Sequence, residues 1–278
     1  MMRSRFSFAS HTTKALVRRD FLLTLKGWGL YLSAFLSLLA SSFILKSHLG
    51  AIKENNILIS SDPLNFPLFI SLVIVSFYLA IISVISISRE KDQGTLEVLF
   101  YGPVNSSSYL VAKYIKDMLL YLVMVCFFFV YFTAVSSLTN LSFSWSLVKA
   151  IFLSIFLVSC IVSFSLFISS LTSKMRTSII WLVGILLAFL AIQIFHTMLV
   201  SLEEEALSSS LLYLRKTLEM VSRGTGWISP FSYLNRGMQS IAIGSMRLYG
   251  MSILYSLVYS FILLVSSVLI LEAKGVRG

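Results

Sequence analysis

Charge is scarce in this chain: only 12% of its 278 residues are Asp, Glu, Lys or Arg, whereas 57% are hydrophobic. The mean hydropathy of +0.89 lies well above the range of water-soluble globular domains. So little charge excludes an ordinary soluble enzyme or binding module. The chain is therefore predicted to reside in a lipid bilayer, as a single membrane domain over residues 1–278.

Residue patterns that usually carry catalysis are also missing. The sequence has no Gly-x-x-x-x-Gly-Lys-Ser/Thr phosphate loop, no His-Glu-x-x-His zinc motif and no Gly-x-Ser-x-Gly nucleophile elbow. Its three histidines, His11, His48 and His196, are far apart, so no metal site is predicted. The chain itself is expected to be non-catalytic and to hold no cofactor. An intramembrane enzyme acting on lipids would need a catalytic constellation that the sequence lacks.

Cysteine is nearly absent, and a nucleic-acid-binding pattern is missing. Cys126 and Cys160 both lie within apolar runs, so we interpret them as small core residues and not as a disulfide or metal pair. The formal net charge is +10, but no Lys/Arg cluster with interleaved aromatic residues lies outside the membrane flanks. Nucleic acid is therefore not an expected partner, and the basic residues are expected to set membrane orientation.

Long apolar stretches are what the sequence has in abundance. Six are long enough to span a bilayer as helices, and no ten-residue alternation typical of a membrane β-barrel occurs. The predicted spans are residues 28–45, 67–88, 119–136, 145–171, 179–199 and 250–271. The fourth is longer than a bilayer requires, so we expect it to tilt or to project. The predicted fold class is an all-α membrane protein.

Basic residues are distributed unevenly around these spans. Fourteen of the 22 Lys and Arg residues lie in the N-terminal arm, between spans two and three, between spans four and five, or in the C-terminal tail. The positive-inside rule therefore predicts cytoplasmic termini. The expected location is the plasma (inner) membrane. A signal peptide is the alternative for the basic start, but the apolar run begins near residue 28 and is long enough to span, which favours an uncleaved helix.

Two regions outside the spans are predicted to lie at the membrane surfaces. Residues 12–26 carry apolar and basic side chains at helical spacing, which predicts an interfacial helix on the cytoplasmic side; a continuation of the first span is the alternative. Residues 201–249 form a long external loop rich in apolar and aromatic residues. We expect short helices there that dip partly into the outer leaflet, with an exposed hairpin of surface helices as the alternative.

Strongly polar residues within the spans are few. Lys113 and Asp117 are spaced i, i+4 beside Lys116, and they are predicted to pair at the inner end of the third span. Gln193 lies well inside the fifth span, where an interhelical contact and a place on a substrate path are both open. Ridges of small residues predict helix-packing or dimer seams, and a ligand-facing serine stripe is the alternative. These ridges comprise Gly184, Ala188, Ser252, Ser256 and Ser260.

One segment concentrates charge between the second and third spans. Five charged residues fall within the nine residues from Arg89 to Glu97. A short cytoplasmic helix is predicted after them. Thr95 is its N-cap, and Leu96, Leu99 and Phe100 share one apolar face. Gly102 and Pro103 are the stop signal. An apolar and acidic helix facing the cytosol implies a protein partner. Anchoring on lipid is disfavoured, because acidic residues would face an anionic leaflet.

At these residues the chain resembles the permeases of type 2 ATP-binding-cassette (ABC) transporters. Their signature loop runs arginine-glutamate, a charged spacer, glycine-threonine-leucine-glutamate and a later proline. The matching residues here are Arg89, Glu90, Gly94, Thr95, Leu96, Glu97 and Pro103. A weaker similarity is Ser229-Pro230-Phe231 with Arg236-Gly237 before the last span.

The resemblance implies the membrane subunit of an ATP-driven exporter. The helix from Thr95 to Tyr101 would be the coupling helix, with Leu99 and Phe100 at its contact with a separate ATPase subunit that binds ATP and Mg²⁺. A second permease subunit, identical or different, is also implied, with Gln193 the main polar residue on the path. The apolar character of the spans favours a hydrophobic or amphipathic cargo. The alternative function is a non-transporting scaffold or regulator that recruits a cytosolic partner through residues 89–103.

Overall fold

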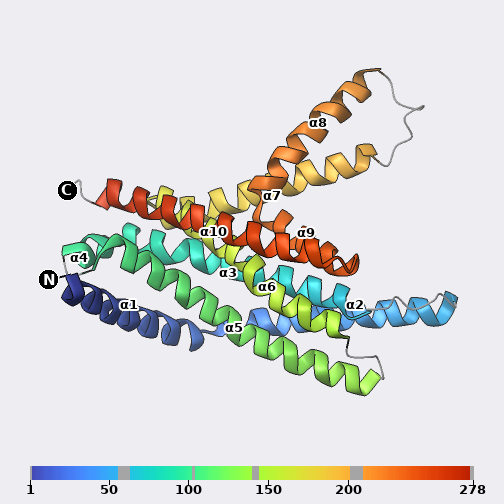
Figure 1. Ribbon diagram of the computed structural model, residues 1–278, viewed down its shortest axis with the longest axis horizontal. Helices are drawn as coiled ribbons and strands as arrows, with labels where there is room; N and C mark the ends of the chain where they lie inside the picture. Colours follow the sequence, from blue (N-terminus) through green and yellow to red (C-terminus); the bar gives the residue numbers. More distant parts are fainter. Residues whose placement is uncertain (1, 56–62, 102–103, 140–143, 201–208, 276–278) are drawn as a thin grey trace.

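The computed structural model describes residues 2–55, 63–101, 104–139, 144–200 and 209–275, and every regular element within these ranges is an α-helix (Figure 1). The helices are α1 (Met2–Leu25), α2 (Trp28–Asn55), α3 (Asn65–Asp92), α4 (Thr95–Tyr101), α5 (Ser106–Thr139), α6 (Trp145–Leu171), α7 (Met175–Val200), α8 (Ser209–Ile228), α9 (Pro230–Ala242) and α10 (Met246–Gly275). The predicted all-α class is confirmed for this part of the chain.

Six of these helices, α2, α3, α5, α6, α7 and α10, are long and apolar enough to cross a membrane, which confirms the predicted number of spans. The bounds of α6 match the prediction, and the other five helices extend beyond theirs. Hydropathy marks only the apolar part of a helix, whereas its backbone hydrogen bonds continue through polar flanking residues. The short α4, the helix α1 and the last turns of α10 lie at the same end of the bundle (Figure 1).

The start of α5 shows the largest difference between predicted and observed bounds. The helix begins at Ser106, not at Leu119, and its 34 residues make it the longest described helix. Lys113, Lys116 and Asp117 interrupt the apolar run of the sequence, but all three side chains are buried in the bundle. Charges that are paired inside a protein can lie on a buried helix face, which hydropathy cannot register.

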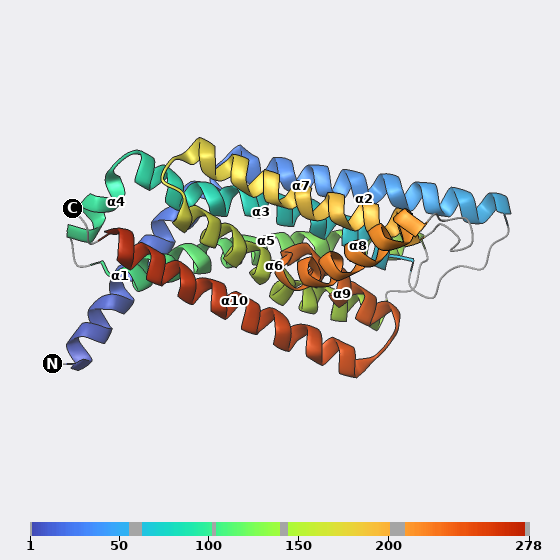
Figure 2. The ribbon, with the colours of Figure 1, turned by 90° about the horizontal axis from the view of Figure 1, so that it is seen from above.

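The helix α6 forms the centre of the bundle. About 78% of its most apolar window is buried, against 17% for those of α7 and α10. It packs against α3 and α10 and also against α9 (Figure 2). The outward faces of α7 and α10 are therefore among the apolar surfaces that this chain exposes.

The helices α8 and α9 form a hairpin between the last two spans. Its tip lies against the middle of α10, where the Tyr259 hydroxyl donates a hydrogen bond to the Ile228 carbonyl oxygen at 2.5 Å. Gly237 lets α9 pack closely on α6, because a Cβ at this position would lie 2.6 Å from a side-chain carbon of Leu157. Three spans separate this hairpin from α4 along the chain, so it belongs to the opposite end of the bundle.

The two cysteines differ from the common role predicted for them. Cys160 is buried against α10, as expected, whereas Cys126 is exposed on α5. The core prediction for Cys126 is therefore wrong. Apolar neighbours do not indicate burial in a membrane protein, since apolar residues such as Phe127 and Val130 also cover the outward face of α5.

Candidate functional site

A tight turn at the end of α3 sets the position of α4. The Gln93 amide donates to the Arg89 carbonyl oxygen, and the Gly94 amide donates to that of Lys91 at 3.1 Å. Gly94 has φ +67°, a left-handed conformation that glycine adopts without strain and that commonly ends helices. Thr95 is the first residue of α4, and its hydroxyl donates to the Glu90 carbonyl oxygen at 3.1 Å. This side chain thus ties α4 to α3 in place of the predicted N-cap acceptor role.

The apolar face of α4 is turned toward the bundle and not toward the cytosol. Leu96 is buried in the main core, and the Phe100 ring meets that of Tyr109 edge to face, with centroids 5.8 Å apart. Val98 and Tyr101 are 72% and 87% exposed. A short amphipathic helix at the end of a bundle can pack its apolar stripe on its own chain, and here Leu96 is buried and Phe100 half-buried. That these two residues contact a partner stays a prediction.

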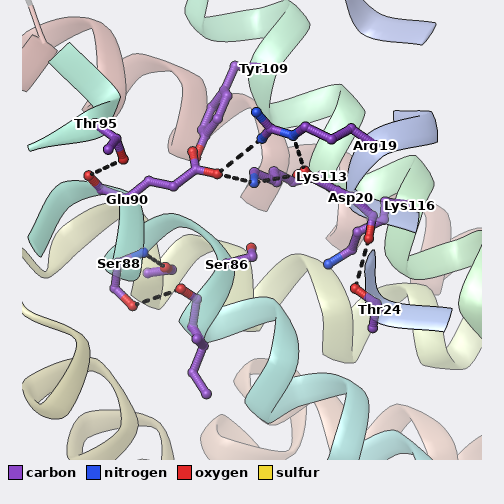
Figure 3. A network of polar contacts seen from close by, with 12 residues as sticks. Arg19, Asp20, Thr24, Ser86, Ser88, Glu90, Thr95, Tyr109, Lys113 and Lys116 are labelled. Carbon is purple, nitrogen blue, oxygen red and sulfur yellow. Dashed lines mark hydrogen bonds and ion pairs between the residues drawn. The ribbon is translucent and has the colours of Figure 1, made fainter. Parts of the chain in front are cut away.

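Glu90, near the end of α3, is the hub of an ion-pair network (Figure 3). The ammonium group of Lys113 on α5 lies 2.6 Å from Glu90 Oε1 and 2.7 Å from Asp20 Oδ2 on α1. The Tyr109 hydroxyl donates to Glu90 Oε2 at 2.5 Å, and an Arg19 nitrogen lies 3.6 Å from Oε1. The cations Arg19 and Lys113 and the carboxylates Asp20 and Glu90 therefore join α1, α3 and α5 next to the turn that leads into α4.

The geometry favours the charged forms of Asp20 and Arg19. Burial opposes ionisation of Asp20, but the nearby Lys113 charge and hydrogen bonds from Lys113 and Arg19 outweigh it, so the pKa of Asp20 is lowered. The hydrogen bond to Asp20 in turn raises the pKa of Arg19, although burial acts against it. Lys113 itself is only 4% exposed. Loss of one partner of so buried an ion pair destabilises the folded protein by about 3–5 kcal/mol.

Lys91, which follows Glu90 near the end of α3, links that helix to α6. Its ammonium group donates to the carbonyl oxygens of Ser170 at 2.6 Å, Thr172 at 3.2 Å and Ser169 at 3.3 Å. These acceptors lie at the C-terminal end of α6, where unpaired carbonyls and the helix dipole favour a cation. The Ser88 amide adds a hydrogen bond to the Ser169 hydroxyl at 3.0 Å. The connector to α4 is thereby fixed to the central helix as well.

The predicted pairing of Lys113 with Asp117 is wrong. Lys113 binds Asp20 and Glu90, while Asp117 lies 2.6 Å from its neighbour Lys116 and accepts a hydrogen bond from Ser83 at 2.8 Å. Same-helix spacing could not reveal partners from other helices. One signal was present, since Asp20 is the only acidic residue in the basic stretch 1–26 and so marks a place where that helix meets a cation.

The remaining predicted site residues are dispersed. Arg89 is exposed near the end of α3, Glu97 is exposed and Leu99 half-buried on α4, and Pro103 lies outside the described residues. Gly184 and Ala188 are exposed on α7. On α10, Ser256 and Ser260 are buried against α6 and Ser252 is half-buried; the Ser159 hydroxyl donates to that of Ser260 at 2.9 Å.

Gln193 lies away from α4, at the opposite end of the bundle. It is an exposed residue of α7 and lines a polar cavity beside α8 and α9. Elsewhere in the described part of the chain, no group of three His, Cys, Asp or Glu side chains is placed to hold a metal ion. The charged network beside α4 joins α1, α3 and α5.

Comparison with known proteins agrees with this architecture. A comparison with curated protein sequences gave no significant match. The family model described as ABC-2 family transporter protein matches residues 9–276, which is nearly the whole chain. With six helices apolar enough to cross a membrane and a family match over nearly its whole length, the chain is a multi-pass membrane protein that belongs to the ABC-2 family and is a membrane subunit of an ABC transporter.

Proposed function

We propose that this chain couples ATP hydrolysis by a separate ABC ATPase subunit to export of a hydrophobic or amphipathic molecule. ATP and Mg²⁺ would be bound by the partner and not by this chain. The working assembly would contain two permease subunits, with α4 and both termini on the cytoplasmic side of the plasma (inner) membrane and α1 in the inner interface. The predominantly apolar spans support the cargo class, and membership of the ABC-2 family supports the transporter role.

The observation that carries the proposal is the attachment of α4 to the rest of the bundle. Glu90 ties the end of α3 to α1 and α5, and Lys91 ties it to α6. A displacement of α4 would therefore act on α3 and, through these contacts, on α1, α5 and α6. A coupling element needs such a connection, because conformational change is transmitted through packed and bonded elements that move as units.

The surface that would receive the partner is the outward side of α4. Glu97, Val98 and Tyr101 are exposed there, while Leu96 faces inward. This arrangement assigns the contact to the acidic and exposed apolar residues, and it assigns Leu96 the role of fixing α4 to the core. The docking surface proposed here is thus narrower than the stretch from Leu96 to Phe100 implied by the family resemblance.

The test is a pull-down of the full chain with its co-expressed ABC ATPase. Val98→Arg should reduce recovery of the ATPase at least about tenfold, because it places a charge at a position that the proposed interface would bury. Met246→Arg is the matched control, since Met246 is similarly exposed at the opposite end of the bundle. Both variants should insert into membranes normally. Normal ATPase recovery with Val98→Arg would overturn the docking surface, and absence of any ATPase from wild-type preparations would favour a scaffold or regulator.

A further inference from the structure

A polar cavity of about 180 Å³ lies where α7, α8 and α9 meet, far from the coupling segment. Of the ten described residues that line it, only Phe189 is apolar, and the others are polar or glycine. Gln193 projects from α7, Thr225 from α8, and Asn235 and Arg236 from α9. Polar groups gathered from three helices in so apolar a chain are typical of a binding site, in which a few placed polar groups orient a ligand.

The charge of the cavity indicates the sign of its ligand. None of the described lining residues is acidic, and Arg236 forms no ion pair with a carboxylate among the described residues. The Arg236 guanidinium instead lies over the Trp227 ring, 5.1 Å from its centroid. A planar cation with several free donors, beside amide and hydroxyl groups, is suited to a phosphate or a similar oxyanion.

The backbone around Arg236 is shaped to hold it. A Cβ on Gly226 would lie 2.7 Å from a guanidinium nitrogen of Arg236, so glycine leaves the space that this cation occupies. By contrast, a Cβ on Gly224 in the same helix would meet nothing within 4 Å. Ser229 and Ser232, at the start of α9, also line the cavity, and the positive end of that helix adds to its attraction for an anion.

The position of the hairpin indicates what kind of molecule carries the anion. The hairpin tip is bonded to Tyr259, which lies roughly 20 Å along α10 from its first residue at 1.5 Å per residue. Beside the cavity, α7 exposes the apolar side chains of Leu190 and Ile194. The volume is below the roughly 300–1,000 Å³ of pockets that enclose a drug-sized ligand. It fits a head group whose apolar remainder stays outside.

We propose that this cavity binds the phosphate-bearing head group of an amphipathic molecule, whose apolar part lies along the outward face of α7. Arg236 provides the charge, and Gly226 and Trp227 hold the guanidinium in place. The identity of this molecule as the cargo rests on the proposed function. Its binding does not, so the experiment is done on the full chain without the ATPase, and failure of one proposal is distinguishable from failure of the other.

The experiment is native mass spectrometry of the full chain in detergent, titrated with dioleoyl phosphatidylglycerol, dioleoylglycerol or inorganic phosphate. Wild type should retain the phospholipid at about tenfold lower concentration than the phosphate-free lipid. If inorganic phosphate displaces the phospholipid at comparable concentration, the ligand is a soluble phosphate compound; if it does not, the lipid head group is recognised. Equal retention of phosphatidylglycerol and dioleoylglycerol would overturn the proposal.

Two pairs of variants locate the site. Arg236→Gln should weaken phosphatidylglycerol binding about tenfold, whereas Arg223→Gln removes an exposed arginine of α8 outside the cavity and should leave it unchanged. Gly226→Ala keeps the arginine but fills its space, so it should weaken binding too, with Gly224→Ala as its control. Thermal unfolding of each variant shows whether the chain is folded. A folded Arg236→Gln protein with wild-type phospholipid binding, or an equal loss in Arg223→Gln, would refute the assignment.

Discussion

At the α4 end of the bundle, Lys113 lies between the carboxylates of Asp20 and Glu90, whereas at the opposite end Arg236 meets an aromatic ring and no carboxylate among the described residues. The first cation is buried and fully paired, and the second is exposed and lines a cavity. Paired buried charges fix helices to one another. A cation whose donors are left available can instead bind an anion from outside. The two ends therefore use charge for different purposes, one for mechanical connection and the other for recognition.

The largest effect is expected from removing the central cation of the α4 network. Lys113→Met should lower the free energy of unfolding by about 3–5 kcal/mol, because Asp20 and Glu90 are left without their partner. Lys174→Met, at an exposed position before α7, is the matched control and should change it by less than about 0.5 kcal/mol. Denaturation of the purified chain measures both. Adding Glu90→Gln to Lys113→Met should recover part of the loss, and strict additivity of the two changes would contradict the network.

A smaller effect is expected from acid. The pKa of Asp20 is lowered in the folded chain. Its contribution to stability is therefore complete at pH values above the ordinary aspartate pKa of about 3.9, and it is lost as the pH falls through the lower folded pKa. Asp20→Asn should remove that part of the pH dependence, and its stability should approach that of wild type only below the folded pKa of Asp20. Unfolding midpoints measured between pH 2 and 6 test this, and an unchanged acid profile in the variant would contradict the assignment.

The smallest effect compares two glycines with the same backbone geometry at the two ends. Gly94 and Gly244 have φ of +67° and +72°, and a Cβ at either would meet nothing within 4 Å. Alanine at each should therefore cost about 1–2 kcal/mol through backbone conformation alone. Only Gly94→Ala should also reduce ATPase stimulation, since that turn positions α4. Equal ATPase stimulation by the two variants would contradict a role of the Gly94 turn in coupling.

Much of the fold followed from local pattern. Apolar runs of spanning length identified all six long helices, and Gly94 with the apolar spacing after it identified α4. The prediction was weakest where charge occurred inside a helix. The start of α5 was placed at Leu119, because Lys113, Lys116 and Asp117 looked like a membrane boundary, yet they are buried with partners.

The candidate site was predicted only in part. Arg89 to Glu97 stood out as a charged segment, but its pattern did not indicate that Glu90 and Lys91 bind three other helices. Their partners Arg19 and Ser170 are many tens of residues away along the chain. No spacing rule joins positions that far apart, because their proximity depends on how the helices pack.

By itself the sequence determined that this chain is a helical membrane protein with a short charged element between its second and third spans. Length and apolarity decide this locally, since each helix satisfies its own backbone hydrogen bonds in lipid. Only the tertiary structure decided which face of α4 is exposed, which carboxylates hold Lys113, and that Gly226 makes room for Arg236. Those features depend on distances of a few ångströms between separate helices, and packing alone sets them.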